Sequence, residues 1–114
     1  MNSATIKITQ RMLDKCIIDA NKSIVEFAFS HLPVTYEEIQ NGEKKTIEAI
    51  FSDGTTSELR LYKRPRGDKL LSIQHLKKKA RAGDTVTLSE PDHQLSNYSV
   101  VIDVERKGSE EVEA

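Results

Sequence analysis

Apolar and polar residues alternate, or apolar residues cluster, over six short stretches of the chain, as is typical of strands with a buried face. These stretches cover residues 5–9, 46–51, 58–62, 69–73, 84–88 and 98–104. The segment between the second and third contains Asp53 and Gly54, a pair that favours tight turns. We therefore expect these two strands to form a hairpin.

Two segments carry the signals of short helices. Asn21 or Ser23 can cap a helix that runs to His31 and is stopped by Pro33. A second short helix is predicted over residues 74–81. Gly83 would end it, because glycine readily adopts the left-handed backbone conformation that follows many helices.

Residues 12–19 fit two patterns. Met12, Leu13, Cys16 and Ile17 have helical spacing, whereas the run from Cys16 to Ile18 is typical of a buried strand. We favour a strand over residues 15–19, with Cys16 as a small buried residue, since a free cysteine most often packs like an apolar side chain.

Seven strands in so short a chain have to protect their edges, which favours a closed or nearly closed barrel. We predict a mainly β, α+β fold with two short helices, in which the strands form a seven-stranded open pseudobarrel. The length of 114 residues is that of one domain, here residues 1–106. Residues 107–114 are acidic and poor in apolar side chains, so we expect a disordered tail.

Charge is distributed unevenly along the chain. Residues 60–81 hold nine basic side chains and one acidic side chain, whereas the whole protein has a net charge of −1. Such a basic segment can bind a polyanion, and nucleic acid is the obvious candidate. The alternative is a solvated basic surface whose arginines pair with local carboxylates.

The order of elements after the basic loop resembles a known DNA-binding fold. A strand at residues 70–73 leads into a short helix at 74–80, and the pair Gly83-Asp84 restarts the chain as a strand. This order resembles the pseudobarrel of plant B3 domains and of the recognition domains of some bacterial restriction endonucleases. The resemblance spans residues 5–104 in element order and about 30 residues in motif.

The resemblance implies two arms that clasp the major groove of double-stranded DNA. The first would follow the first strand, with Gln10, Arg11 and Lys15, and the second would run from Tyr62 to Lys69. Arginine can bridge guanine O6 and N7, glutamine can do the same for adenine, and lysine suits phosphate. With the rest of the basic segment, the predicted DNA-binding residues are Gln10, Arg11, Lys15, Arg60, Tyr62, Lys63, Arg64, Arg66, Lys69, Lys77 and Lys78.

Signals of catalysis are weak. His31, His75 and His93 are far apart and have no metal-ligand spacing, and the chain has no glycine-rich phosphate loop. We therefore expect neither an enzyme nor a bound cofactor or metal. A single cysteine, no apolar run of membrane-spanning length and no signal peptide favour a cytoplasmic protein without a membrane partner.

Three classes of function remain open. The first is a sequence-specific DNA-binding module, either alone or as the recognition part of a larger restriction or defence system. The second is a protein-interaction or inhibitor domain whose basic face docks an acidic partner. The third, with the least support, is a small metal-dependent enzyme.

Overall fold

A computed structural model describes residues 3–91 and 98–106, and this part of the chain contains seven strands, three short α-helices and one 3₁₀ helix. The strands are β1 (Ser3–Lys7), β2 (Ile18–Asp19), β3 (Lys44–Phe51), β4 (Thr56–Lys63), β5 (Lys69–Ile73), β6 (Thr85–Ser89) and β7 (Val100–Glu105). The helices are α1 (Gln10–Lys15), α2 (Lys22–His31), η1 (Tyr36–Glu38) and α3 (Leu76–Lys79).

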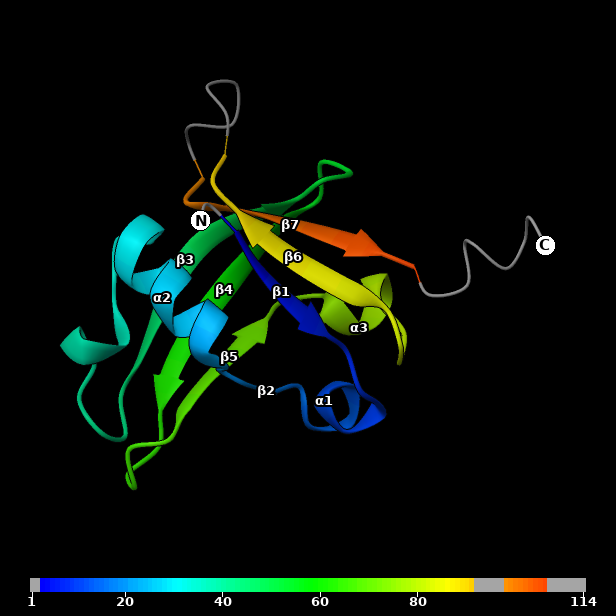
Figure 1. The fold of residues 1–114 in the computed structure, drawn as a ribbon. Coiled ribbons are helices and arrows are strands. Elements are labelled where there is room, and N and C mark those ends of the chain that lie inside the picture. The colour runs from blue at the N-terminus through cyan, green and yellow to red at the C-terminus, as the bar shows by residue number, and fades with distance from the viewer. Residues whose placement is uncertain (1–2, 92–97, 107–114) are drawn as a thin grey trace.

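All seven strands belong to one sheet, in the order β1-β6-β7-β3-β4-β5-β2. Neighbouring strands are antiparallel except β3 and β7, which are parallel. The sheet curls into a half-barrel, and α1 lies in the connection between its two edge strands, β1 and β2 (Figure 1). The prediction of a mainly β protein with a seven-stranded open barrel is confirmed.

Apolar side chains from the inner face of the sheet meet those of α2 in one core. Along β4, Leu59 and Leu61 are fully buried. The Asn21 side chain accepts a hydrogen bond from the Ile24 backbone N–H at 2.9 Å, which caps α2 as the sequence indicates. Helix α2 then packs against β1 and buries Ile24 and Phe27.

The 3₁₀ helix η1 is attached to β5, which lies near the other edge of the sheet from β1. The Tyr36 hydroxyl donates a hydrogen bond of 2.8 Å to the Leu70 carbonyl of β5. Burial raises the pKa of the Tyr36 phenol above its ordinary value, because the charged form would lose its hydration. The phenol therefore stays protonated and able to donate this bond.

The prediction for residues 15–19 is wrong in two respects. The helical alternative is the one that forms, as α1, and only Ile18–Asp19 is a strand. Thr9 caps α1 by accepting the Met12 N–H at 3.2 Å, and Leu13 buries its side chain in the core. Cys16 ends the helix in the left-handed conformation at φ 55° and is exposed rather than buried.

The helix predicted over residues 74–81 is shorter than expected. It covers only Leu76–Lys79, because His75 adopts a left-handed backbone at φ 69° and Ala80 is extended. With α1, the described residues thus contain three short α-helices where the sequence predicted two.

The connection from α3 to β6 is tied to the end of β1. The Gly83 N–H bonds the Ile8 carbonyl at 2.7 Å, and the Ile8 N–H bonds the Asp84 carbonyl at 2.8 Å. Asp84 is only 3% exposed, and its carboxylate accepts the Arg81 N–H at 2.8 Å. Asp84 is therefore a structural residue that closes the tight connection.

Two sequence-based predictions fall partly or wholly beyond what the structure describes. The acidic tail at residues 107–114 lies outside the described residues, as does His93. Within the described ranges, no helix combines the length and the apolar character that crossing a bilayer requires.

Gly83 has a φ of 96°, a conformation in which a branched side chain is strained. We expect Gly83→Val to lower the free energy of unfolding by about 1–2 kcal/mol, the cost of the left-handed region for an L-residue. Denaturant unfolding measures this change. Ala82→Val places valine at an exposed neighbour whose φ is not positive, and it should have little effect. Equal losses in both variants would contradict the strain argument.

Candidate nucleic-acid interface

Four polar side chains share the face of the sheet that looks away from the core. Arg60 and Tyr62 alternate with buried leucines along β4, so they point to the opposite face. Lys44 of β3 pairs directly with Tyr62, and Ser72 of β5 pairs directly with Arg60. The register of three strands therefore brings Lys44, Arg60, Tyr62 and Ser72 together.

These side chains line an open groove of about 440 Å³. One wall comes from the link between α1 and β2, and another from the segment that precedes β3. We call it the basic groove, and its lining residues are Cys16, Ile17, Gly42, Lys44, Arg60, Tyr62, Leu71 and Ser72.

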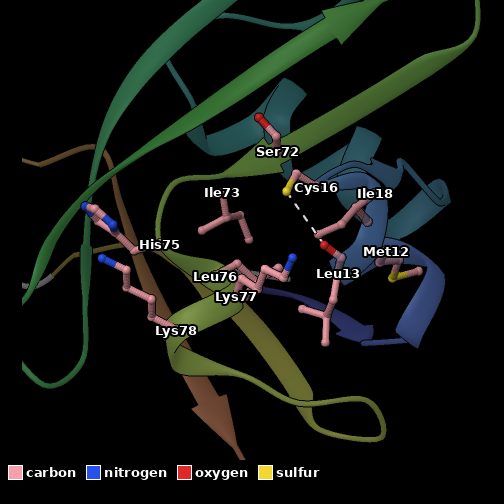
Figure 2. Close-up of a pocket in the computed structure, with 10 residues that line it drawn as sticks. All are labelled: Met12, Leu13, Cys16, Ile18, Ser72, Ile73, His75, Leu76, Lys77 and Lys78. Carbon is pink, nitrogen blue, oxygen red and sulfur yellow. Dashed lines mark hydrogen bonds between the residues drawn. The ribbon is translucent and has the colours of Figure 1, made fainter.

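A smaller, mostly apolar pocket of about 220 Å³ adjoins the basic groove, with Cys16 and Ser72 in both linings. It lies between α1, the end of β5 and α3 (Figure 2). The Lys77 side chain extends towards α1, whereas Lys78 lies on the side of His75. Two of the predicted site residues, Lys77 and Lys78, thus line the pocket next to the groove.

The turn between β4 and β5 continues from the Tyr62 end of the groove. The Arg64 N–H bonds the Asp68 carbonyl at 2.9 Å, and the Gly67 N–H bonds the Arg64 carbonyl at 2.7 Å. Gly67 has a φ of 96°, which suits glycine. A hydrogen bond from the Gly42 N–H to the Lys63 carbonyl, 2.6 Å long, anchors the base of the turn. The turn is held in one bent shape by its backbone.

Three of the predicted arginines contact carboxylates. Arg60 lies 3.5 Å from Glu58, while Arg64 and Arg66 lie 3.8 and 3.0 Å from the same oxygen of Asp68. All of these side chains are substantially exposed. Part of the basic charge is therefore balanced locally, as the alternative interpretation of the sequence expects.

The remaining predicted residues are placed around this surface. Gln10, Arg11 and Lys15 are exposed on α1, and the Gln10 amide donates to Asp14 at 2.9 Å. Lys63 and Lys69 pair across the base of the turn. Within the described part of the chain, the ion pairs include none of Arg11, Lys15, Lys63, Lys69, Lys77 and Lys78.

Lys79, the third lysine of α3, has a different environment. Its ammonium donates to Asp53 at 2.7 Å and to Thr55 at 2.8 Å, and it lies 5.5 Å from the centre of the Phe51 ring. Consecutive helical residues point in different directions, so the three lysines could not share one face. Lys79 ties α3 to the β3–β4 hairpin.

Of the residues that line the basic groove, the sequence predicted only Arg60 and Tyr62, and Lys44 and Cys16 are the most informative of those it missed. Lys44 lies outside the basic segment at residues 60–81, yet the hairpin pairing places it opposite Tyr62. Counting pairs outward from the Asp53-Gly54 turn would have found it. Cys16 was missed because the sequence favoured a buried strand at that position, and nothing in the pattern indicates its exposed helix end.

The structure offers little for metal chemistry. Over residues 3–91 and 98–106, no three His, Cys, Asp or Glu side chains are grouped as a metal site requires. His31 lies 2.8 Å from Glu90 and 5.3 Å from the Phe27 ring. This histidine therefore packs at the end of α2 and makes a local ion pair when it is protonated.

No protein-family model matches the chain, and no curated protein matches it in sequence. The resemblance to B3-like domains therefore stays a prediction, based on the residues quoted for it. Any function assigned to the basic groove has to be argued from its own geometry and charge.

The contact between Lys79 and Asp53 predicts a pH dependence of stability. Hydrogen bonds from Lys79 and from the Thr55 N–H lower the pKa of Asp53 from 3.8 to about 2 in the folded protein. A carboxylate with a lowered pKa stabilises the fold above its unfolded pKa, and this contribution disappears as the pH falls through the folded value. We expect wild type to be more stable than Asp53→Asn at neutral pH, with a difference that shrinks between about pH 4 and pH 2.

Thermal unfolding of both proteins across this pH range measures the effect. Lys79→Met keeps much of the side chain against Phe51 but removes the donor, so stability in this variant should depend less on pH in the same window. A difference between wild type and Asp53→Asn that stays constant from neutral pH to pH 2 would contradict the assignment.

Proposed function

We propose that this protein is a double-stranded DNA-binding module that reads sequence in the major groove. The supporting observation is that cationic side chains lie at both ends of the basic groove. Arg64 and Arg66 belong to the turn at one end, next to Lys69 at the start of β5, and Lys77 and Lys78 follow β5 at the other. The five residues of β5 span about 16 Å, so the two basic ends are far enough apart to reach across a major groove about 12 Å wide.

The local ion pairs do not prevent such binding. Exposed salt bridges contribute only about 0–1 kcal/mol each, because water solvates both charges well. A bidentate contact between an arginine and guanine discriminates by about 1–3 kcal/mol, and each phosphate contact adds the release of counterions. The arginines of the turn can therefore exchange their carboxylate contacts for DNA at a small cost.

The arginines of the turn and the lysines at both ends of the groove suit different kinds of contact with DNA. The guanidinium groups of Arg64 and Arg66 are on a turn with a fixed backbone, which suits base reading. The lysines Lys69, Lys77 and Lys78 are exposed at both ends and suit phosphate oxygens. The proposal applies equally to a protein that acts alone and to the recognition part of a larger restriction or defence system.

Substitutions should separate the two kinds of contact. We expect Arg64→Ala or Arg66→Ala to cost about 1–3 kcal/mol on a preferred duplex and to flatten the preference at one or two base pairs. Lys78→Ala should weaken all duplexes alike and reduce the salt slope by about 1, since each phosphate contact contributes a log–log slope of about −0.9. Titrations of selected and random duplexes at several salt concentrations measure both effects.

Lys7→Ala serves as the control, because this exposed lysine lies on β1 and not at the groove. A wild-type slope near zero on random duplex would remove DNA as the partner and favour the acidic-protein alternative. If the arginine and lysine variants behave identically on both kinds of duplex, the turn binds phosphate only and does not read bases.

A further inference from the structure

Asp68 is the acceptor shared by two arginines of the β4–β5 turn. One of its oxygens, Oδ2, accepts a hydrogen bond of 3.0 Å from Arg66 Nη2 and lies 3.8 Å from Arg64 Nη1. The side chains of Arg64, Arg66 and Asp68 are 39%, 76% and 47% exposed. An accessible carboxylate therefore sits between two accessible guanidinium groups.

The backbone of the turn keeps these three side chains together. Residue 64 donates its N–H to the carbonyl of Asp68, and Gly67 donates to the carbonyl of Arg64. Both bonds use backbone atoms, so they do not depend on the carboxylate. A guanidinium has five N–H donors, and a contact with Asp68 leaves most of them available.

The acidic member makes this cluster a poor match for phosphate. A carboxylate beside a phosphate would bring two negative charges together, and this repulsion opposes the attraction of the arginines. A base edge is different, because it presents donors as well as acceptors. The cluster therefore favours base edges on the floor of the DNA major groove over the phosphates of the DNA backbone.

A guanine–cytosine pair presents the complementary pattern in the major groove. Guanine offers two acceptors, O6 and N7, which match an arginine fork, and cytosine offers a donor, the N4 amino group, which matches a carboxylate. An adenine–thymine pair would place the adenine amino group against arginine and thymine O4 against the carboxylate. We propose that the β4–β5 turn reads a guanine–cytosine pair, with Asp68 as a specificity-determining residue.

This inference rests on the proposed function, and it adds the base pair that is recognised and the residue that rejects the others. Selection from a randomised duplex library tests it first. Wild type should enrich a site in which one guanine–cytosine pair is not replaced by any other base pair. Replacing that pair by adenine–thymine should lower wild-type affinity about tenfold or more, the equivalent of one good bidentate contact.

Asp68→Asn should weaken this tenfold discrimination without abolishing it, since the arginine contact to guanine remains, and it should raise the affinity for random duplex, because a negative charge is removed. Glu105→Gln is the charge-matched control on β7, away from the turn, and it should keep the discrimination. Asp68→Glu restores the charge at a different length, so it should return random-duplex affinity to the wild-type level without restoring the full discrimination. Melting temperatures check that all variants fold.

The outcomes distinguish failure of the proposed function from failure of this inference. A wild-type protein with no salt-dependent DNA binding overturns the proposed function and this inference with it. Specific binding to a site without an essential guanine–cytosine pair, or Asp68→Asn with wild-type discrimination, overturns the inference alone. Equal effects of Asp68→Asn and Glu105→Gln would assign Asp68 to general electrostatics and overturn its role in specificity.

Discussion

Leu59 and Leu61 are both fully buried between β3 and β5, and their packing sets the register of three strands at once. A slip of one residue along β4 would turn both leucines to solvent and bury Arg60, so it is strongly disfavoured. Through this register the core determines which polar residues meet on the outer face. The basic groove is a consequence of how the interior packs.

The same register arranges charge along the outer face. Beyond the row that contains Arg60 lies a pair of glutamates, Glu48 and Glu58, directly opposite each other on β3 and β4. The face therefore changes from basic near the turn to acidic near the parallel strand β7. This gradient would hold a polyanion towards the β4–β5 turn, since the acidic end repels phosphate. A protein of near-neutral net charge can in this way offer one localised anion-binding region.

The sequence predicts most of the sheet because one buried face leaves a two-residue period, which is visible in β4 and in β6. It fails between β1 and β2, where six residues form α1. There the Thr9 cap is a local signal that the sequence analysis did not use, whereas the burial of Leu13 in the core depends on tertiary structure. Lys44 was missed because the basic segment was found by counting charges along the chain, whereas the groove combines residues from neighbouring strands.

The central proposal is that a DNA duplex binds across the basic groove, with the β4–β5 turn in the major groove of the DNA. Titration of the isotope-labelled protein with a short duplex, followed by backbone amide NMR, tests it most directly. The account predicts shifts concentrated at Cys16, Lys44, Ser72, Lys77, Lys78 and residues 63–69, with the hairpin around Asp53 unaffected. Shifts confined to that hairpin, or spread evenly over the surface, would contradict it.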